Sequence, residues 1–334
     1  MRPVALTRDK LAMRDLLRCS GIPTVRYCRC DSPRDVEVLI GLIGGPVVVK
    51  PARGAGSAGV NLVDAAGGAA AAWAAANGAS AAQPVIAEEY VGGAEVSVDT
   101  MSYDGRHEVV AIAEKVTTGR PHFVELGHQV PARLDPPQVA RIGGLVLHFL
   151  DLIGQVQGPA HTELKIDGER LVLIESQTRT GGDQIWELNR LATGYDMHRA
   201  SLRHLLLGER PRPGRLERAA AVRFFTAAPG VVSRVAGAEE AVEAEGVSRL
   251  KLDVAVGGTV GPLDSSQARL GYVVCEGPDV GTAVQRAERA KCMVCIEIVP
   301  AVAQTAPGVP EAAAVGCCDG SPASSPRVEA SPHG

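Results

Sequence analysis

Apolar positions recur along the chain with two different spacings, and each spacing predicts one kind of element. Over residues 137–153 they return every three or four residues, which is typical of an amphipathic helix. Shorter β-branched or alternating runs, broken by glycine, indicate strands. The strands are expected at residues 46–49, 60–63, 85–91, 95–101 and 109–116, and further helices at 7–20, 69–76, 184–192 and 196–207. This mixture predicts an α+β fold, with Thr7 as the cap of the first helix.

The pattern also divides the chain. The sequence PRPGR at residues 211–215 indicates a linker, so we expect one domain in residues 1–210 and a smaller α+β domain in residues 216–300. The smaller domain alternates strand-like runs with one helix, expected at residues 279–291. Residues 301–334 are rich in Ala, Pro, Gly and Ser with few charges, which predicts a disordered tail.

Composition narrows the class of protein. Of the 334 residues 46% are hydrophobic and 22% are charged, the formal net charge is −4, and aromatic residues make up only 3%. No basic run alternates with stacking aromatic side chains, which argues against a nucleic-acid partner. No apolar stretch approaches the roughly 20 residues that span a bilayer, and the first residues lack the apolar core of a secretory signal. We therefore expect a cytoplasmic enzyme with no membrane partner.

A segment near the middle of the chain, HTELKIDGERLVLIESQTRTGGD, carries the most specific chemistry. Glu163 and Glu175 lie at equal distances on either side of Glu169, so a hairpin that turns there places the two carboxylates opposite each other. Gln177 follows on the same face, and two carboxylates with an amide oxygen suit Mg²⁺ bound between protein and nucleotide phosphates. Arg179 adds a cation. Phosphoryl transfer is the functional interpretation, and a surface hairpin with solvated charges is the alternative.

A glycine-rich loop and a lysine come earlier in the chain. Gly54, Gly56 and Gly59 in RGAGSAG would let backbone N–H groups approach phosphate oxygens, although a hairpin turn explains the same glycines. Lys50 ends a β-branched run, so we expect a buried strand whose last ammonium group is free to meet a phosphate.

The segment VIAEEYVGGAE predicts a strand that ends in acidic residues before a glycine break, which suits an adenine-binding hinge. Backbone groups of Tyr90 and Val91 would pair with the purine edge, and the Glu95 carboxylate would take the ribose hydroxyl groups. For Glu88 and Glu89 the alternative is a pair of charges on an edge strand.

Taken in order, these motifs resemble the ATP-grasp superfamily. The matching segments are TRDKLAMRDLLRCSGIPTVRY, GGPVVVKPARGAGSAGV, VIAEEYVGGAEVSVD and the glutamate hairpin, which run from about residue 7 to about residue 210. The runs RFFTAAPG and RLGYVVCEG, within residues 219–299, look like the C-terminal domain of the L-amino-acid ligase branch. The resemblance implies an ATP-grasp fold, in which two α+β subdomains grip ATP, followed by a small C-terminal α+β domain.

The resemblance implies roles for the nucleotide-binding residues one by one. Lys10 and Lys50 would contact the ATP phosphates, and the glycine-rich loop would cover them as a lid. Glu88, Tyr90 and Val91 would hold the adenine, and Glu95 would hold the ribose.

The resemblance also implies catalytic and metal-binding roles. Glu163 and Glu175 would bind Mg²⁺, for which Mn²⁺ is an alternative, and Arg179 would bind the substrate carboxylate and the acyl phosphate formed from it. In the ligase branch an acidic residue and a histidine three apart line the amino-acid pocket. Glu125 and His128 match that spacing.

Two features depart from the family pattern. The third metal ligand is usually Asn, and here it is Gln177, whose longer side chain shifts the amide oxygen. The family also carries about 100 residues of α/β structure before its first motif, whereas Lys10 lies close to the start of this sequence. A companion chain is one expected source of that domain, and a homodimer is the default association.

The predicted function is that of an ATP- and Mg²⁺-dependent ligase that joins a small carboxylate to an amine, such as an amino acid, through an acyl phosphate. Two alternatives stay open: a biotin-carboxylase-type enzyme and a non-catalytic ATP-binding subunit. Bicarbonate-dependent ATP hydrolysis would favour the first, and ATP binding without amine-dependent turnover would favour the second. The expected partners are ATP and small carboxylate and amine substrates.

Overall fold

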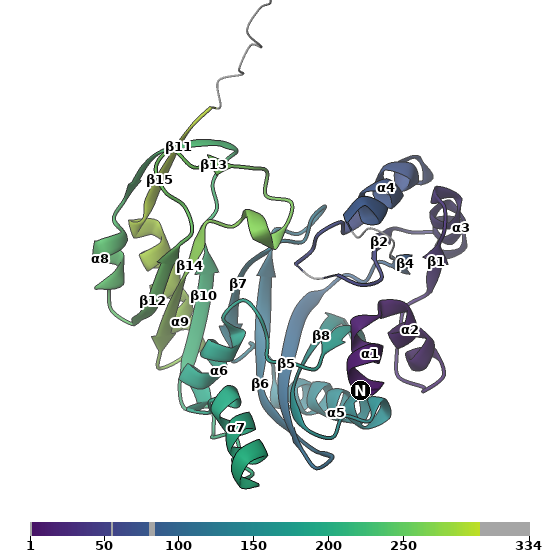
Figure 1. The fold of residues 1–334 in the computed structure, drawn as a ribbon, viewed down its shortest axis with the longest axis horizontal. Coiled ribbons are helices and arrows are strands. Elements are labelled where there is room, and N and C mark those ends of the chain that lie inside the picture. The colour runs from purple at the N-terminus through teal and green to yellow at the C-terminus, as the bar shows by residue number, and fades with distance from the viewer. Residues whose placement is uncertain (1, 55, 80–83, 301–334) are drawn as a thin grey trace, which may run out of the picture. The chain divides into compact units, whose positions relative to one another are not determined.

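The structure is a computed structural model that describes residues 2–54, 56–79 and 84–300 (Figure 1). The chain up to Pro300 forms one compact unit. No helix in these described ranges is long and apolar enough to cross a membrane. The predicted tail, residues 301–334, lies outside the described residues, and the domain boundary at residues 211–215 stays a prediction.

A four-stranded antiparallel sheet with strand order β1-β4-β2-β3 forms the first part of the fold. Its elements are β1 (Tyr27–Cys30), α3 (Pro33–Ile43), β2 (Val47–Pro51), β3 (Asn61–Val63), the 3₁₀ helix η1 (Ala66–Gly68), α4 (Ala69–Ala79) and β4 (Val85–Glu89). Val36 of α3, Val49 of β2 and Ala72 of α4 share one buried apolar core. The predicted pairing of residues 46–49 with residues 60–63 is confirmed.

An eight-stranded antiparallel sheet follows, with strand order β12-β14-β10-β7-β6-β5-β8-β9. Its strands are β5 (Ala94–Tyr103), β6 (Arg106–Thr117), β7 (Glu125–Val130), β8 (Gly158–Asp167), β9 (Arg170–Gln177), β10 (Ala219–Phe224), β12 (Val247–Leu252) and β14 (Gly271–Gly277). Because β7 pairs with β10, this sheet is continuous across the predicted domain boundary.

Helices cover both faces of the large sheet. They are α5 (Pro136–Ile153), α6 (Ile185–Thr193) and α7 (Met197–Leu207). On β6, Ile112 packs in the core that contains α5, whereas Ala111 and Ala113 pack in the core that contains α6. This alternation follows from the two-residue period of a strand. The apolar stripe predicted over residues 137–153 is therefore the face of α5 that packs on the sheet.

A three-stranded sheet, β13-β11-β15, completes the C-terminal part. The remaining elements there are β11 (Gly230–Ala236), α8 (Ala238–Val242), β13 (Thr259–Val260), the 3₁₀ helix η2 (Ser266–Ala268), α9 (Val280–Met293) and β15 (Cys295–Val299). The prediction of one helix in this part was wrong, because α8 precedes α9. Five residues are too few for a helical apolar period to show in the sequence.

Two short helices, α1 (Arg2–Arg8) and α2 (Lys10–Arg18), replace the single helix predicted near the N-terminus. Asp9 separates them, because it is extended and its carboxylate accepts hydrogen bonds from the first turn of α2. The prediction that Thr7 caps this helix was therefore wrong, since Thr7 lies inside α1. The new start places Lys10 and Arg14, four residues apart, on one buried face of α2.

Candidate active site

One pocket collects almost all of the predicted site residues. Those on its wall are Lys10, Lys50, Gly54, Gly56, Glu88, Tyr90, Val91, Glu95, Glu125, His128, Glu163, Glu175, Gln177 and Arg179. Gly59 is the exception. At its φ of +71°, an added Cβ would lie 2.6 Å from the Cβ of Ala79, so close packing against α4 requires this glycine. The ligand contact of each residue stays a prediction.

The glutamate hairpin, formed by β8 and β9, makes one side of the pocket. Strands β8 and β9 are antiparallel, and Glu163 lies directly opposite Glu175. A β-bulge next to this pair leaves Ile174 without a partner on β8, which brings Glu175 into register. The amide group of Gln177 donates a hydrogen bond from Nε2 to Glu175 Oε1 at 3.1 Å, so two of the three side chains predicted to bind metal are in contact, and all three line the pocket.

This donor set fits a hard divalent cation. Two carboxylates and an amide oxygen suit Mg²⁺, which normally takes further oxygen ligands from phosphates and water. Within the described parts of the chain, no three His, Cys, Asp or Glu side chains gather as a metal site. Lys10 Nζ lies 3.0 Å from Glu175 Oε2. Burial disfavours the charged form of Lys10, but attraction to Glu175 outweighs it and raises the pKa of the lysine.

Glu88 and Lys50 form a buried ion pair. Lys50 Nζ lies 2.6 Å from Glu88 Oε2, so the expectation of a free ammonium group at Lys50 was wrong. Glu88 lies on β4, an interior strand of its sheet, which also rules out the edge-strand alternative for this residue. Burial opposes the Glu88 charge, but the neighbouring Arg14 and Lys50 lower the pKa of its carboxyl group to about 2. The carboxylate therefore orients Lys50 within the pocket wall.

Arg14 connects the Lys50–Glu88 ion pair to β9, the strand that carries Glu175. The sequence analysis missed this residue. Its side chain is fully buried, and Nε donates to Glu88 Oε1 at 2.7 Å. Nη1 and Nη2 donate to the carbonyl oxygens of Leu173 and Ile174 at 2.6 and 3.0 Å, which are the residues at the bulge. One guanidinium group thus holds both the Lys50 partner and the bulge beside Glu175. Its spacing of four from Lys10 was the available signal.

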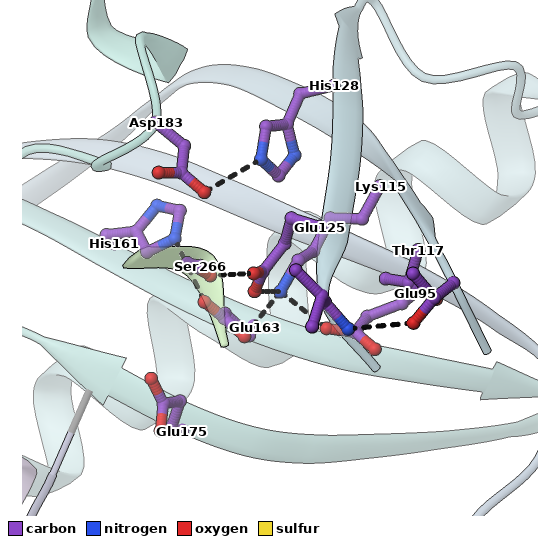
Figure 2. A network of polar contacts seen from close by, with 12 residues as sticks. Glu95, Lys115, Thr117, Glu125, His128, His161, Glu163, Glu175, Asp183 and Ser266 are labelled. Atoms are coloured by element: carbon purple, nitrogen blue, oxygen red, sulfur yellow. Dashed lines mark hydrogen bonds and ion pairs between the residues drawn. The ribbon is translucent and has the colours of Figure 1, made fainter. Parts of the chain in front are cut away.

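Lys115 of β6 is a second residue that sequence reasoning missed (Figure 2). Its Nζ lies 2.5 Å from Glu95 Oε1, 2.8 Å from Glu163 Oε2 and 3.6 Å from Glu125 Oε1. Burial opposes the charge, but Glu163 and the other carboxylates hold the pKa of Lys115 well above its usual value. One ammonium group therefore joins the residues predicted for ribose, metal and amine binding.

A buried histidine supports Glu163 from the other side. His161 Nε2 lies 3.4 Å from Glu163 Oε1, and His161 Nδ1 lies 2.7 Å from Asp99 Oδ1. Burial lowers the pKa of His161, but the Asp99 carboxylate outweighs it and raises the pKa to about 9. Gly181 is required here, since an added Cβ would lie 2.9 Å from His161 Nδ1. The Asp99–His161 pair was also missed, because its members are distant in sequence.

The predicted amine-binding residues meet groups from the C-terminal part of the chain. His128 Nε2 lies 3.5 Å from Asp183 Oδ2, and Ser266 Oγ donates to Glu125 Oε2 at 2.6 Å. Arg269 forms two hydrogen bonds to the Asp183 carboxylate, from Nη1 at 2.8 Å and from Nη2 at 2.6 Å. Burial opposes the charge on Asp183, but its bonds to Arg269 hold the pKa of this carboxyl group well below its usual range.

The predicted adenine hinge lies at the end of β4. The Tyr90 ring stacks with Phe123 at a centroid distance of 5.9 Å, and the Arg120 guanidinium lies 4.7 Å from the Tyr90 ring centroid. The backbone N–H of Tyr90 donates to the carbonyl oxygen of Pro46 at 3.1 Å. A purine edge would therefore pair with the carbonyl group of Tyr90 and the N–H of Val91.

Two protein families match the chain. The ATP-grasp domain matches residues 43–187, and the L-amino acid ligase C-terminal domain 2 matches residues 223–299. An uncharacterized protein of Sinorhizobium fredii is 29% identical over 294 residues, which cover 84% of this chain and 59% of that protein. Alanine–anticapsin ligase of Bacillus subtilis is 27% identical over 225 residues, which cover 60% of this chain and 47% of that protein. The chain thus spans about half the length of these curated relatives.

A solved structure of an L-amino acid ligase has a similar fold. L-amino acid ligase from Bacillus licheniformis has a TM-score of 0.76 at 22% identity, covering 89% of this chain and 74% of that chain. The fold is the predicted ATP-grasp fold, with the ATP-grasp domain matched over residues 43–187. The C-terminal match, over residues 223–299, is to a domain of L-amino acid ligases, so the predicted resemblance to that branch is confirmed.

Proposed function

We propose that this protein is an ATP-dependent, ADP-forming ligase that joins a small carboxylate to an amine. The observation that carries the proposal is that one pocket is lined both by Lys10, Lys50 and the glutamate hairpin, which we assign to the phosphates, and by Glu125 and His128, which we assign to the amine. The match to the L-amino acid ligase C-terminal domain 2 supports a ligase over a carboxylase. ATP and small carboxylate and amine substrates are the partners in this proposal.

The first step is phosphoryl transfer to the acid. A carboxylate oxygen of the substrate attacks the γ-phosphorus of ATP, ADP leaves, and an acyl phosphate forms. Mg²⁺, held by Glu163, Glu175 and Gln177, would neutralise charge on the β- and γ-phosphates. Lys10 and Lys50 bind the phosphates as fixed cations whose positions are set by their carboxylate partners.

Arg179 orients the acid during this step. Its Nη1 donates to the carbonyl oxygen of Thr180 at 2.7 Å, and the side chain lines the pocket beyond the hairpin. A guanidinium group can bind a carboxylate through two parallel hydrogen bonds and can follow it as it becomes an acyl phosphate. This role places the reacting oxygen beside the γ-phosphate.

The second step forms the amide. Glu125 receives the ammonium group of the acceptor, and His128, which lines the same pocket, takes part in its deprotonation in this proposal. The neutral amine then attacks the acyl carbon, and phosphate leaves with the oxygen that came from the acid. Water must be excluded while the acyl phosphate exists, and the loop that carries Gly54 and Gly56 faces the pocket for this purpose.

The substrates that we propose are small amino acids. The name alanine–anticapsin ligase indicates that one relative joins an amino acid to another compound, and this chain resembles it over 60% of its length. Mn²⁺ is a proposed replacement for Mg²⁺. A cytoplasmic location, a homodimer and a companion chain stay predictions.

The test is ADP and phosphate release by the purified chain with ATP and Mg²⁺, screened against pooled amino acids, with products identified by mass. Release that depends on the pool, with a product whose mass equals the two amino acids minus water, supports the ligase. Release that depends on bicarbonate instead identifies a carboxylase-type enzyme. ATP binding without release in any pool contradicts the ligase and favours a non-catalytic subunit.

A further inference from the structure

A turn from the C-terminal part of the chain reaches the pocket beside Glu125 (Figure 2). Ser266, the first residue of η2, lines the pocket, and its Oγ donates a hydrogen bond to Glu125 Oε2 at 2.6 Å. The backbone N–H of Ser266 donates to the carbonyl oxygen of Gly56 at 3.3 Å. One short turn therefore touches both the carboxylate proposed for amine binding and the glycine-rich loop.

Arg269 holds this turn in place. Its Nε donates to the carbonyl oxygen of Ser266 at 2.8 Å, and its two terminal nitrogens bind the Asp183 carboxylate. The guanidinium group also lies 3.7 Å from the centroid of the Phe224 ring. A planar guanidinium with paired hydrogen bonds and a stacked ring has little freedom. Arg269 therefore acts on the position of Ser266, since each of its three nitrogens donates to a group of the protein.

Asp183, which binds Arg269, has an unusual backbone conformation. Its φ is +51°, in the left-handed region that non-glycine residues rarely adopt. This conformation is maintained while the carboxylate binds Arg269 and contacts His128. Strained residues of this kind concentrate at functional sites, where the surrounding contacts hold them.

Glu125 has two polar neighbours that set its orientation. Lys115 Nζ is 3.6 Å from Oε1, while Ser266 Oγ is 2.6 Å from Oε2, and the carboxylate side chain is 15% exposed. Each carboxylate oxygen has two lone pairs, so Oε2 can accept from Ser266 and also from an ammonium group. Without the hydroxyl group, the shorter of these two contacts is lost and the carboxylate can rotate.

We propose that Ser266 is a positioning residue for the amine acceptor. Its hydroxyl group fixes the Glu125 carboxylate so that the free oxygen sites receive the ammonium group of a small amino acid. The inference rests on the proposed function. It means that the C-terminal part of the chain takes part in selecting the acceptor, while the ATP-binding residues all come from the preceding part.

The experiment compares Ser266→Ala, Ser266→Thr and Ser265→Ala in the full chain, with the acid and amine that the pooled screen identifies. Ser265→Ala is the matched control, because Ser265 is adjacent but its side chain makes no capping hydrogen bond. We expect Ser266→Ala to raise the KM of the amine about 10-fold, as for the loss of a hydrogen bond to a charged group. The KM values of ATP and of the acid should not change. Ser266→Thr, which keeps the hydroxyl group, should restore the amine KM.

Hydroxylamine gives a second measurement, the formation of hydroxamate, which a general loss of structure would lower. It is uncharged at neutral pH, so it can attack the acyl phosphate without an ammonium contact at Glu125. Hydroxamate formation by Ser266→Ala should therefore equal that of the unmodified chain. Arg269→Gln should show the same selective rise in amine KM, because it releases the turn.

The outcomes separate this inference from the proposed function. A screen that finds no amine-dependent product overturns both. Ligation by the unmodified chain with an unchanged amine KM in Ser266→Ala overturns only the role of Ser266. The role of Ser266 is also overturned if Ser266→Ala raises the KM values of ATP and amine equally. The same holds if this variant loses hydroxamate formation as much as it loses ligation, because the defect would then not be specific to the acceptor.

Discussion

The two halves of the pocket differ in how their charges are held. In the phosphate half, buried lysines and carboxylates pair directly, as in Lys10–Glu175, Lys50–Glu88 and Lys115–Glu163. In the amine half, Glu125 also contacts Lys115, but its shortest contact is the Ser266 hydroxyl group, and Asp183 pairs with Arg269; both partners come from a turn of the C-terminal part. The direct pairing of lysines and carboxylates suits a ligand of high charge, because the charged groups of the protein are fixed in position before the ligand binds. The second arrangement suits a small substrate, whose ammonium group shares a carboxylate with the protein.

The largest effect is expected from Glu175→Ala in the phosphate half. Removing one of two opposed carboxylates should lower ADP formation about 1000-fold, because the charge of the transferred phosphoryl group loses its metal site. Coupled-enzyme measurement of ADP release checks this. Glu169→Ala is the matched control, since Glu169 lies in the turn of the same hairpin with its side chain 94% exposed. ADP release by Glu175→Ala at the rate of Glu169→Ala would contradict the metal assignment.

The second largest effect is expected from acid, which should lower the free energy of unfolding through the buried Glu88 pair in the phosphate half. The folded-state pKa of Glu88 is about 2 against an ordinary value of 4.5, so its ionised form stabilises the fold above pH 4.5. That contribution, on the order of 3 kcal/mol, is lost as the pH falls towards 2. Urea unfolding between about pH 5 and pH 3 measures it. Glu88→Gln should flatten this slope and the exposed Glu169→Gln should not, whereas equal slopes in all three proteins would count against the buried pair.

A smaller effect is expected from Arg14→Lys, which keeps the charge beside Glu88 but cannot bond both carbonyl groups at the bulge. The register of Glu175 should loosen, and the Mg²⁺ concentration for half-maximal activity should rise about 10-fold. Activity measured against Mg²⁺ at saturating ATP tests this. Arg18→Lys on the exposed side of the same helix should leave the Mg²⁺ requirement unchanged. A loss of activity that added Mg²⁺ does not reduce would show a role in stability alone.

The smallest effect belongs to the amine half. Asp183→Asn keeps the shape of the side chain but weakens its bonds to Arg269, so the turn with Ser266 should loosen. We expect a rise of about fivefold in the amine KM and no change in the KM of ATP. Initial rates with each substrate varied in turn distinguish the two. An increase in the KM of ATP instead would remove the distinction between the halves.

The phosphate half was largely predictable from the sequence, because its main motif is local. The spacing of Glu163 and Glu175 around Glu169 predicted that the carboxylates lie opposite each other, and the structure has that pairing. The bulge at Ile174 that completes the register was not predictable, since it depends on Arg14 in a distant helix.

The amine half was predictable only in part. Glu125 and His128 lie on one strand and line the pocket, and the family spacing was the signal that singled them out; their role stays a prediction. Ser266 and Arg269 come from residues far along the chain and reach Glu125 only after β10 and β14 have joined the large sheet. Lys115 was missed for a similar reason, because a single lysine in a strand has no local signal until three carboxylates surround it.

The most direct test of ligation through an acyl phosphate follows one oxygen atom. The acid substrate is labelled with ¹⁸O in its carboxylate, and the phosphate released with ATP and the amine is analysed by mass. The mechanism predicts one labelled oxygen in each phosphate, because the acid oxygen that attacks the γ-phosphorus leaves with it. Unlabelled phosphate, released while ATP is consumed, would show that water attacks the nucleotide and would contradict the proposed function.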